Sequence, residues 1–249
     1  MPTISLVFSF IFGTLIGSFL NVVAYRYKTG MTLGGRSKCF SCNKTLTWTE
    51  LFPVLSFILQ KGACKKCKSK ISWQYPIVEM VTGVLFAMIF YYFPPFSIAA
   101  GIETFFYLII TSILIVITIY DAKHKIIPNA WVYTFDAIAL LHILLSPSIY
   151  DFLAGPIIAL PFFLIWLVSK GKWMGLGDAK LLLGIGWTLG LIPAISAVIL
   201  AFWIGAIISV LWMWVVFRKF KTRYEIPFGP YLILGMYLVL FFHYNVLFF

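Results

Sequence analysis

The sequence predicts an all-α polytopic membrane protein of about eight transmembrane helices with a small cytoplasmic insert. Three observations support this fold class. Of the 249 residues, 62% are hydrophobic and only 11% are charged, which is too little polar surface to enclose a soluble core. Apolar runs long enough to cross a bilayer recur along the chain, and basic residues gather in every second connection between them.

The first apolar run, 4–25, has no basic residue before it, so we expect a retained span rather than a cleaved signal peptide. Between 181 and 216 the chain carries no charge over 36 residues. As one helix that stretch would be about 54 Å long, whereas a bilayer core is about 30 Å thick. Gly190–Pro193 offers a turn, so we expect a hairpin of two spans and eight spans in total. The remaining runs are 76–93, 103–120, 130–145, 151–169 and 226–249.

The basic residues predict the orientation. By the positive-inside rule the basic connections are cytoplasmic, which places both termini on the outer side of the membrane. The net charge of +11 is then mostly a consequence of topology, and we expect a lipid bilayer and no nucleic acid as partner. The chain divides into a first span (1–26), a cytoplasmic insert (27–74) and a seven-span core (75–249). The basic connections are 26–70, Lys123 and Lys125, Lys170 to Lys180, and Arg218 to Arg223.

The insert contains all four cysteines, as Cys39-x₂-Cys42 and Cys64-x₂-Cys67 separated by 21 residues. Two such pairs fit a tetrahedral Cys₄ zinc site with no open coordination position, so the metal is expected to be structural. Iron in the same site and a pair of disulfides are the alternatives, and the reducing cytoplasm disfavours the disulfides. The apolar segment 52–59 is too short to span and is expected at the membrane interface.

Two aspartates lie at the edges of apolar runs, Asp121 after the third span and Asp178 before the sixth, on the same predicted face. Carboxylates so close to hydrocarbon are costly, and two brought together can share one proton so that the other acts as general base toward water. Gly175 and Gly177 remove side chains where a backbone must bend into such a site. Two structural alternatives stay open. Asp178 can simply cap the sixth span, and Asp121 can pair with a nearby lysine.

The other ionisable residues indicate a function less clearly than these two aspartates. Asp136 lies about two turns into the fourth span, either as a third active-site acid or as an interhelical contact. Glu79 lies where the second span leaves the insert, and is our candidate for a cofactor-binding carboxylate. A salt bridge to a lysine of the insert is the alternative. Glu50 is expected to be an ordinary loop charge, and the three histidines lack the spacing of a metalloprotease.

The chain resembles the bacterial type IV prepilin peptidases along its whole length. The matching segments are 17–26 (GSFLNVVAYR), the two cysteine pairs, 53–57 (PVLSF), 71–79 (ISWQYPIVE), Asp121 with 127–129 (IPN), 175–182 (GLGDAKLL) and 226–230 (IPFGP). The resemblance implies an aspartic endopeptidase that removes the leader of prepilins and type II secretion pseudopilins. It also implies N-methylation of the new terminus with S-adenosylmethionine. Asp121 and Asp178 would be catalytic, the four cysteines would bind zinc, and Gly175, Gly177 and Lys180 would shape the site.

Two other classes remain as alternatives. Signal-peptide-peptidase or presenilin-like proteases share Tyr-Asp and Gly-Leu-Gly-Asp strings, but they carry Pro-Ala-Leu where this chain has 226–230, and they lack the cysteine insert. A channel or transporter with a zinc module would also need intramembrane acids and helix-breaking glycines. The inverted sequence halves that would mark such a transporter are not found.

Overall fold

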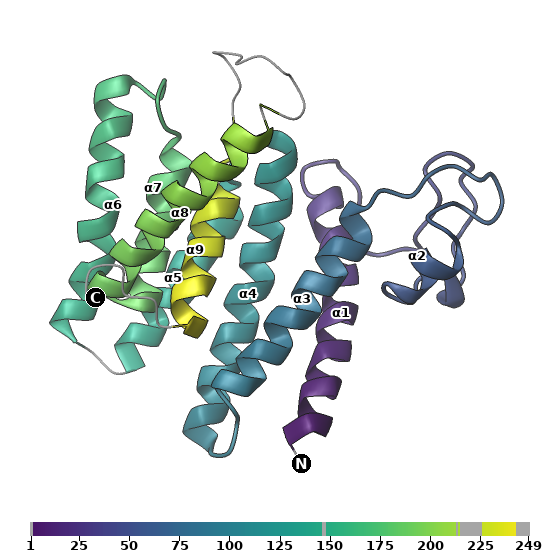
Figure 1. The fold of residues 1–249 in the computed structure, drawn as a ribbon, viewed down its shortest axis with the longest axis horizontal. Helices are drawn as coiled ribbons and strands as arrows, with labels where there is room; N and C mark the ends of the chain where they lie inside the picture. Colours follow the sequence, from purple (N-terminus) through teal and green to yellow (C-terminus); the bar gives the residue numbers. More distant parts are fainter. Residues whose placement is uncertain (1, 146–147, 213, 215–225, 243–249) are drawn as a thin grey trace. The chain divides into compact units, whose positions relative to one another are not determined.

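The computed structural model describes residues 2–145, 148–212, 214 and 226–242. Over these residues the protein is helical, with isolated β-bridges but no β-strand (Figure 1). The helices are α1 (Pro2–Arg26), η1 (Trp48–Glu50), α2 (Leu55–Leu59), α3 (Gln74–Tyr92), α4 (Ile98–His124), α5 (Asn129–Leu145), α6 (Ile149–Ser169), α7 (Leu176–Leu189), α8 (Leu191–Trp212) and α9 (Gly229–Phe242).

The chain forms two compact units, residues 1–116 and 117–249, and α4 runs from the first into the second. In the first unit α1 packs along α3, and glycines on α1 allow the backbones to approach closely. A Cβ on Gly13 would lie 2.8 Å from Gly83 Cα, and one on Gly17 would lie 2.9 Å from Glu79 Cα. The polar insert joins the two helices, so its position is fixed at one end of this pair.

In the second unit α7 packs against α5, α6, α8 and α9. Small residues again make this possible, because α7 has glycine where its neighbours come closest. A Cβ on Gly186 would lie 2.6 Å from Gly155 Cα on α6, and one on Gly184 would overlap the Phe135 ring on α5. The α7 backbone is therefore held on several sides.

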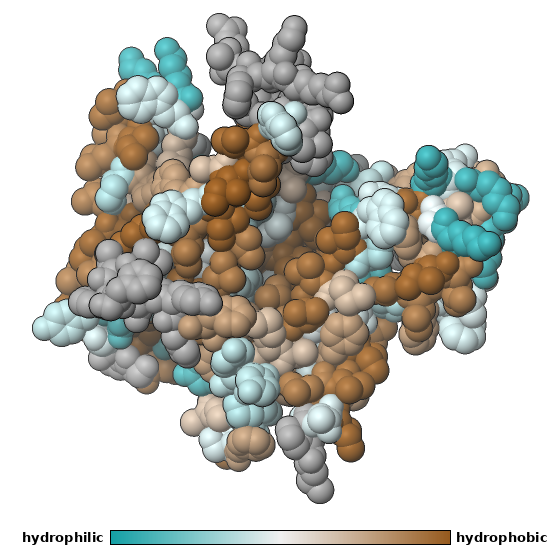
Figure 2. Space-filling view, viewed as in Figure 1, coloured by the Kyte–Doolittle hydropathy of each residue, from teal (hydrophilic) through white to brown (hydrophobic). Residues whose placement is uncertain are grey.

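Five described helices, α1, α3, α4, α6 and α8, are long and apolar enough to cross a membrane, and α5 and α9 are shorter apolar helices. Figure 2 shows the outward hydrophobic side chains, for example over α6. The break expected within 181–216 is confirmed, since α7 ends at Leu189 and α8 starts at Leu191. Gly190 makes this break with a φ of +79°, which favours glycine. Arg218 to Arg223 lie outside the described residues, as does the end of the last apolar run beyond Phe242.

Candidate functional site

Asp121 lies in the last turn of α4 and is almost completely buried, with 3% of its surface exposed. Its Oδ2 accepts a hydrogen bond of 3.0 Å from the backbone N–H of Gly229, the first residue of α9. The N–H groups in the first turn of a helix have no partner within the helix, so they suit a carboxylate. A Cβ on Gly229 would lie 2.6 Å from Asp121 Oδ2, so only glycine allows this contact without a shift.

Asp178 is the third residue of α7 and is half-buried. The N-cap of α7 is Gly175, whose backbone N–H bonds the Asp178 carboxylate. The alternative in which Asp178 itself caps the helix is therefore wrong, because the helix begins two residues before it. Its carboxylate instead turns back toward the start of the helix, where the macrodipole favours negative charge.

The segments that carry the two aspartates converge on one side chain, that of Ile127. A Cβ on Gly177 would lie 2.8 Å from Ile127 Cβ, and one on Gly229 would lie 3.3 Å from Ile127 Cδ1. Gly177 precedes Asp178, and Gly229 bonds Asp121, so the two carboxylates come to the same side of the second unit.

Lys180 fixes the start of α5 against the start of α7. Its Nζ donates to Asn129 Oδ1 at 3.0 Å and lies 4.7 Å from the centre of the Tyr133 ring. The structure thus links Lys180 to the 127–129 segment, which also contains Ile127. Asn129 and Gly229 were not singled out as site residues in the sequence. Their only signal was membership of the short Ile-Pro segments at 127–129 and 226–230.

Two further acids on the long helices are buried, one in each unit. Asp136, on α5, faces α7 at Gly184, and its Oδ1 is buried without a hydrogen-bond partner among the described residues. Glu79 is buried on α3, and its Oε2 accepts a 2.7 Å hydrogen bond from the backbone N–H of Val54 in the insert. Glu79 thus contacts the insert through a backbone amide rather than through a lysine.

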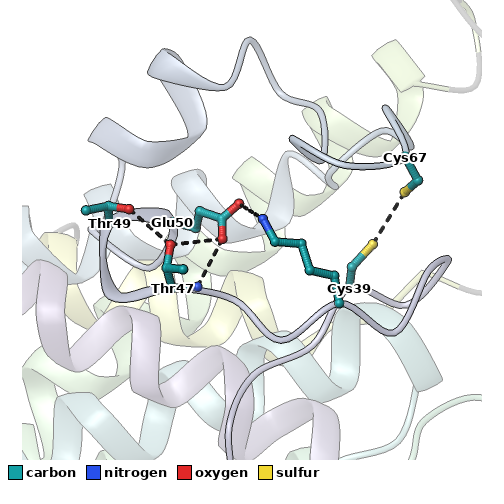
Figure 3. Close-up of polar contacts among 6 residues, drawn as sticks. Cys39, Thr47, Thr49, Glu50 and Cys67 are labelled. Carbon is teal, nitrogen blue, oxygen red and sulfur yellow. Dashed lines mark hydrogen bonds and ion pairs between the residues drawn. The ribbon is translucent and has the colours of Figure 1, made fainter.

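The four cysteines of the insert, Cys39, Cys42, Cys64 and Cys67, form one cluster, which we call the cysteine cluster. Their sulfurs all lie within 4.8 Å of one another, and those of Cys39 and Cys67 are 3.7 Å apart (Figure 3). Tetrahedral zinc with Zn–S bonds of about 2.3 Å places sulfurs about 3.8 Å apart, so the cluster fits this metal. No disulfide joins them.

The two cysteine pairs lie on loops of the same shape. The Cys39 N–H donates to the Lys44 carbonyl and the Cys64 N–H to the Ser69 carbonyl, both at 2.9 Å. Asn43 and Lys68, one residue after the second cysteine of each pair, have left-handed φ values of +53° and +59°. In the first loop the backbone N–H groups of Cys42 and Ser41 lower the pKa of Cys39 to about 6. Burial and the neighbouring cysteines raise the pKa of Cys42 to about 11, so the first loop favours the thiolate form that a metal requires at Cys39 rather than at both of its cysteines.

An ion pair stabilises the loop that contains Cys39 and Cys42. Lys44 Nζ lies 2.7 Å from Glu50 Oε1, and Glu50 Oε2 accepts 3.0 Å hydrogen bonds from both the N–H and the hydroxyl of Thr47 (Figure 3). The hydrogen bond from Lys44 is the main cause that lowers the pKa of Glu50 to about 2. Glu50 is only 6% exposed, so the expectation of an ordinary loop charge is wrong. It is a structural anchor of the insert.

Comparisons with known proteins identify the family of the chain. Residues 11–93 match the Bacterial Peptidase A24 N-terminal domain, and residues 108–210 match the Type IV leader peptidase family. A protein of Bacillus subtilis named prepilin leader peptidase/N-methyltransferase is 33% identical over 235 residues, which cover 91% of this chain and 90% of that protein. No solved structure matches the chain significantly.

More distant relatives carry the same name. The one from Pseudomonas aeruginosa is 29% identical over 92% of this chain and 87% of its own length. The one from Vibrio cholerae is 28% identical over 97% of this chain and 98% of its own. Identity of this kind over nearly the full length of both chains shows common descent, and the chain belongs to the type IV leader peptidase family, the bacterial prepilin leader peptidases.

Proposed function

We propose that the protein is a membrane aspartic endopeptidase that removes the leader of type IV prepilins and type II secretion pseudopilins, with Asp121 and Asp178 as its catalytic residues. The observation that carries this proposal is the convergence of the two carboxylates around Ile127, with a backbone N–H on each. The family supports prepilin processing, since its curated members carry that activity in their names.

The chemistry follows from two carboxyl groups in a partly dry site. They cannot both ionise comfortably, so one keeps a proton and the other takes a proton from water. The water attacks the carbonyl carbon of the scissile peptide bond while the protonated carboxyl donates to the carbonyl oxygen. The tetrahedral intermediate then collapses, and the leaving nitrogen accepts a proton. The N–H groups of Gly229 and Gly175 hold the two carboxylates in position throughout.

We further propose eight spans, with both termini outside and the active site at the cytoplasmic face of the bacterial inner membrane. Asp121 is followed by Lys123 and Lys125, and Asp178 by Lys180, so basic residues accompany both carboxylates. The positive-inside rule assigns such segments to the cytoplasm. There the site can receive a substrate helix that enters from the bilayer.

Incubation of the purified full-length protein with a synthetic prepilin peptide tests this function. The peptide contains a basic leader, a glycine before the cleavage point and a following phenylalanine, and mass spectrometry measures leader loss. We expect cleavage after the glycine by the wild type and by Asp151→Asn, which changes an exposed carboxylate of the same unit. Cleavage at scattered sites or none by the wild type would contradict the proposal.

We also propose N-methylation of the new terminus with S-adenosylmethionine, and Glu79 as a residue of that site. The methyl donor is a sulfonium cation, which supplies the methyl group, and a buried carboxylate suits its charge. Glu79 also holds the insert through Val54, so a test must separate the two roles. Glu79→Gln keeps an acceptor for the Val54 N–H. It should therefore lower methylation with cleavage retained, whereas equal loss of both products would contradict a special role.

The cysteine cluster is proposed to bind structural zinc. Four sulfurs at near-tetrahedral spacing leave no position for water or substrate, so the metal would hold the insert together and take no part in cleavage. The insert has few buried apolar side chains, Phe57 and Cys64 among them, which makes such support necessary.

A further inference from the structure

The first unit has an open groove where the insert meets α3. It has a volume of about 780 Å³. The insert supplies one wall and the first turns of α3 supply the other. The apolar side chains of these walls include those of Val54, Phe57, Ile58, Ile77, Met80 and Val81.

Specific contacts of the fold hold the groove in place. The Val54 N–H donates to Glu79 Oε2 at 2.7 Å, which fixes the start of α2 on α3. Val54 has a φ of +60°, a strained value for a β-branched residue, and this bond helps to maintain it. The Phe57 and Trp73 rings, which both line the groove, pack with centroids 4.8 Å apart. These contacts give the groove a defined shape, so it is not a gap between loosely packed segments.

The apolar walls are exposed. Ile58 is 63% exposed, Ile77 55% and Met80 41%. Ile77 and Met80 lie at the start of α3, one of the five helices able to cross a membrane. Figure 2 shows hydrophilic side chains on the outer part of the insert and a hydrophobic strip where it continues toward α3. An exposed apolar surface at this position suits an apolar partner at the edge of the bilayer.

The charged residues that line the groove are both lysines, Lys61 and Lys70. Within 27–74 the sequence has nine Lys and Arg residues and a single acid, Glu50, which is paired with Lys44. Lysine stems lie along apolar surface while their ammonium groups reach outward. The groove therefore combines a hydrocarbon-lined cleft with two cations at its rim.

We propose that this groove binds an anionic phospholipid, with an acyl chain along Ile58, Ile77 and Met80 and the phosphate at Lys61 and Lys70. A lipid can enter sideways because α3 is itself exposed to the bilayer along Val81 and beyond. The lipid would anchor the insert to the membrane surface. A basic peptide is disfavoured as occupant because both rim residues are cationic.

Native mass spectrometry of the full-length protein in neutral detergent at about 0.15 M ionic strength, with phosphatidylglycerol or phosphatidylcholine added, measures this binding. We expect phosphatidylglycerol to be retained in preference to phosphatidylcholine. A lysine near an anionic lipid contributes roughly fivefold in affinity, so the double variant Lys61→Gln, Lys70→Gln should bind about 25-fold more weakly. The matched control Lys65→Gln, Lys66→Gln has the same charge change outside the groove and should stay within about twofold of wild type.

A second pair of variants tests the apolar wall. Ile58→Ser, inside the groove, should weaken phosphatidylglycerol binding, whereas Leu59→Ser on the same helix, 80% exposed and outside the groove, should not. Three outcomes would overturn the proposal: equal retention of phosphatidylcholine, equal binding by both lysine variants, or displacement of the lipid by glycerol phosphate or by a prepilin peptide. The first would remove the preference for an anionic lipid, the second the role of Lys61 and Lys70, and the third would assign the groove to another ligand. None of them would affect the proposed peptidase chemistry.

Discussion

Gly229→Ala should reduce cleavage by acting directly on Asp121. The new Cβ would lie 2.6 Å from Asp121 Oδ2, whereas carbon and oxygen normally approach to about 3.3 Å. The carboxylate or the start of α9 must therefore move by about 0.7 Å, the difference between these distances. Misplacement of a reacting group by about 1 Å costs about 100-fold in rate, so we expect kcat to fall by about 10- to 100-fold. KM should change little, because Gly229 is not proposed to bind substrate.

The assay is the initial rate of leader removal from the prepilin peptide over a range of concentrations. Gly229 lies outside the left-handed region, so alanine brings no backbone penalty, and overpacking should cost about 1–3 kcal/mol in stability at most. Gly101→Ala is the control, because it is also a helical glycine and a Cβ there meets nothing within 4 Å. A Gly229→Ala protein with the kcat of wild type would refute the idea that the Gly229 contact positions Asp121.

Three further predictions follow from the same contacts. Gly177→Ala places a Cβ 2.8 Å from Ile127 Cβ, so it should displace the start of α7 and lower kcat in the same assay. An unchanged rate would count against the convergence of the two segments at Ile127. Lys68 has a left-handed φ of +59°, which glycine adopts without strain, so Lys68→Gly should stabilise the insert by up to about 1 kcal/mol. The variant should lose its metal to a chelator more slowly than wild type, and faster loss would contradict this prediction. Elemental analysis should find about one zinc per chain, whereas a folded, metal-free protein with four Ellman-reactive thiols would exclude the structural zinc.

Local sequence patterns predicted the features that depend on neighbouring residues. The cysteine spacing predicted the cysteine cluster, because each Cys-x₂-Cys pair forms its own loop. A charge-free stretch longer than a bilayer predicted the break at Gly190. Asp121 and Asp178 stood out because carboxylates are rare at the edges of apolar runs. Each of these signals lies within a few tens of residues of the structure that it predicts.

Contacts between distant segments could not be predicted in this way. Gly229 bonds Asp121 across 108 residues, and nothing near Gly229 in the sequence indicates a carboxylate. Two short-range details were also missed. Glu50 was expected to be an ordinary loop charge, but Lys44 and Thr47, six and three residues before it, bond its carboxylate and it is buried. The alternative in which Asp178 caps the sixth span placed the helix start too late, since Gly175 takes the capping position.

The catalytic pair is tested most directly by the cleavage rates of Asp121→Asn, Asp178→Asn and the double variant. Each single change removes a carboxyl group that shared-proton catalysis requires, and asparagine keeps the side-chain volume and the acceptor for the N–H of Gly229 or Gly175. General acid–base groups contribute about 10²–10⁴-fold, so each single variant should lose at least about 100-fold in kcat. The double variant should be no slower than the slower single one, because the two groups act as a unit. Near-normal cleavage by either single variant would contradict the account.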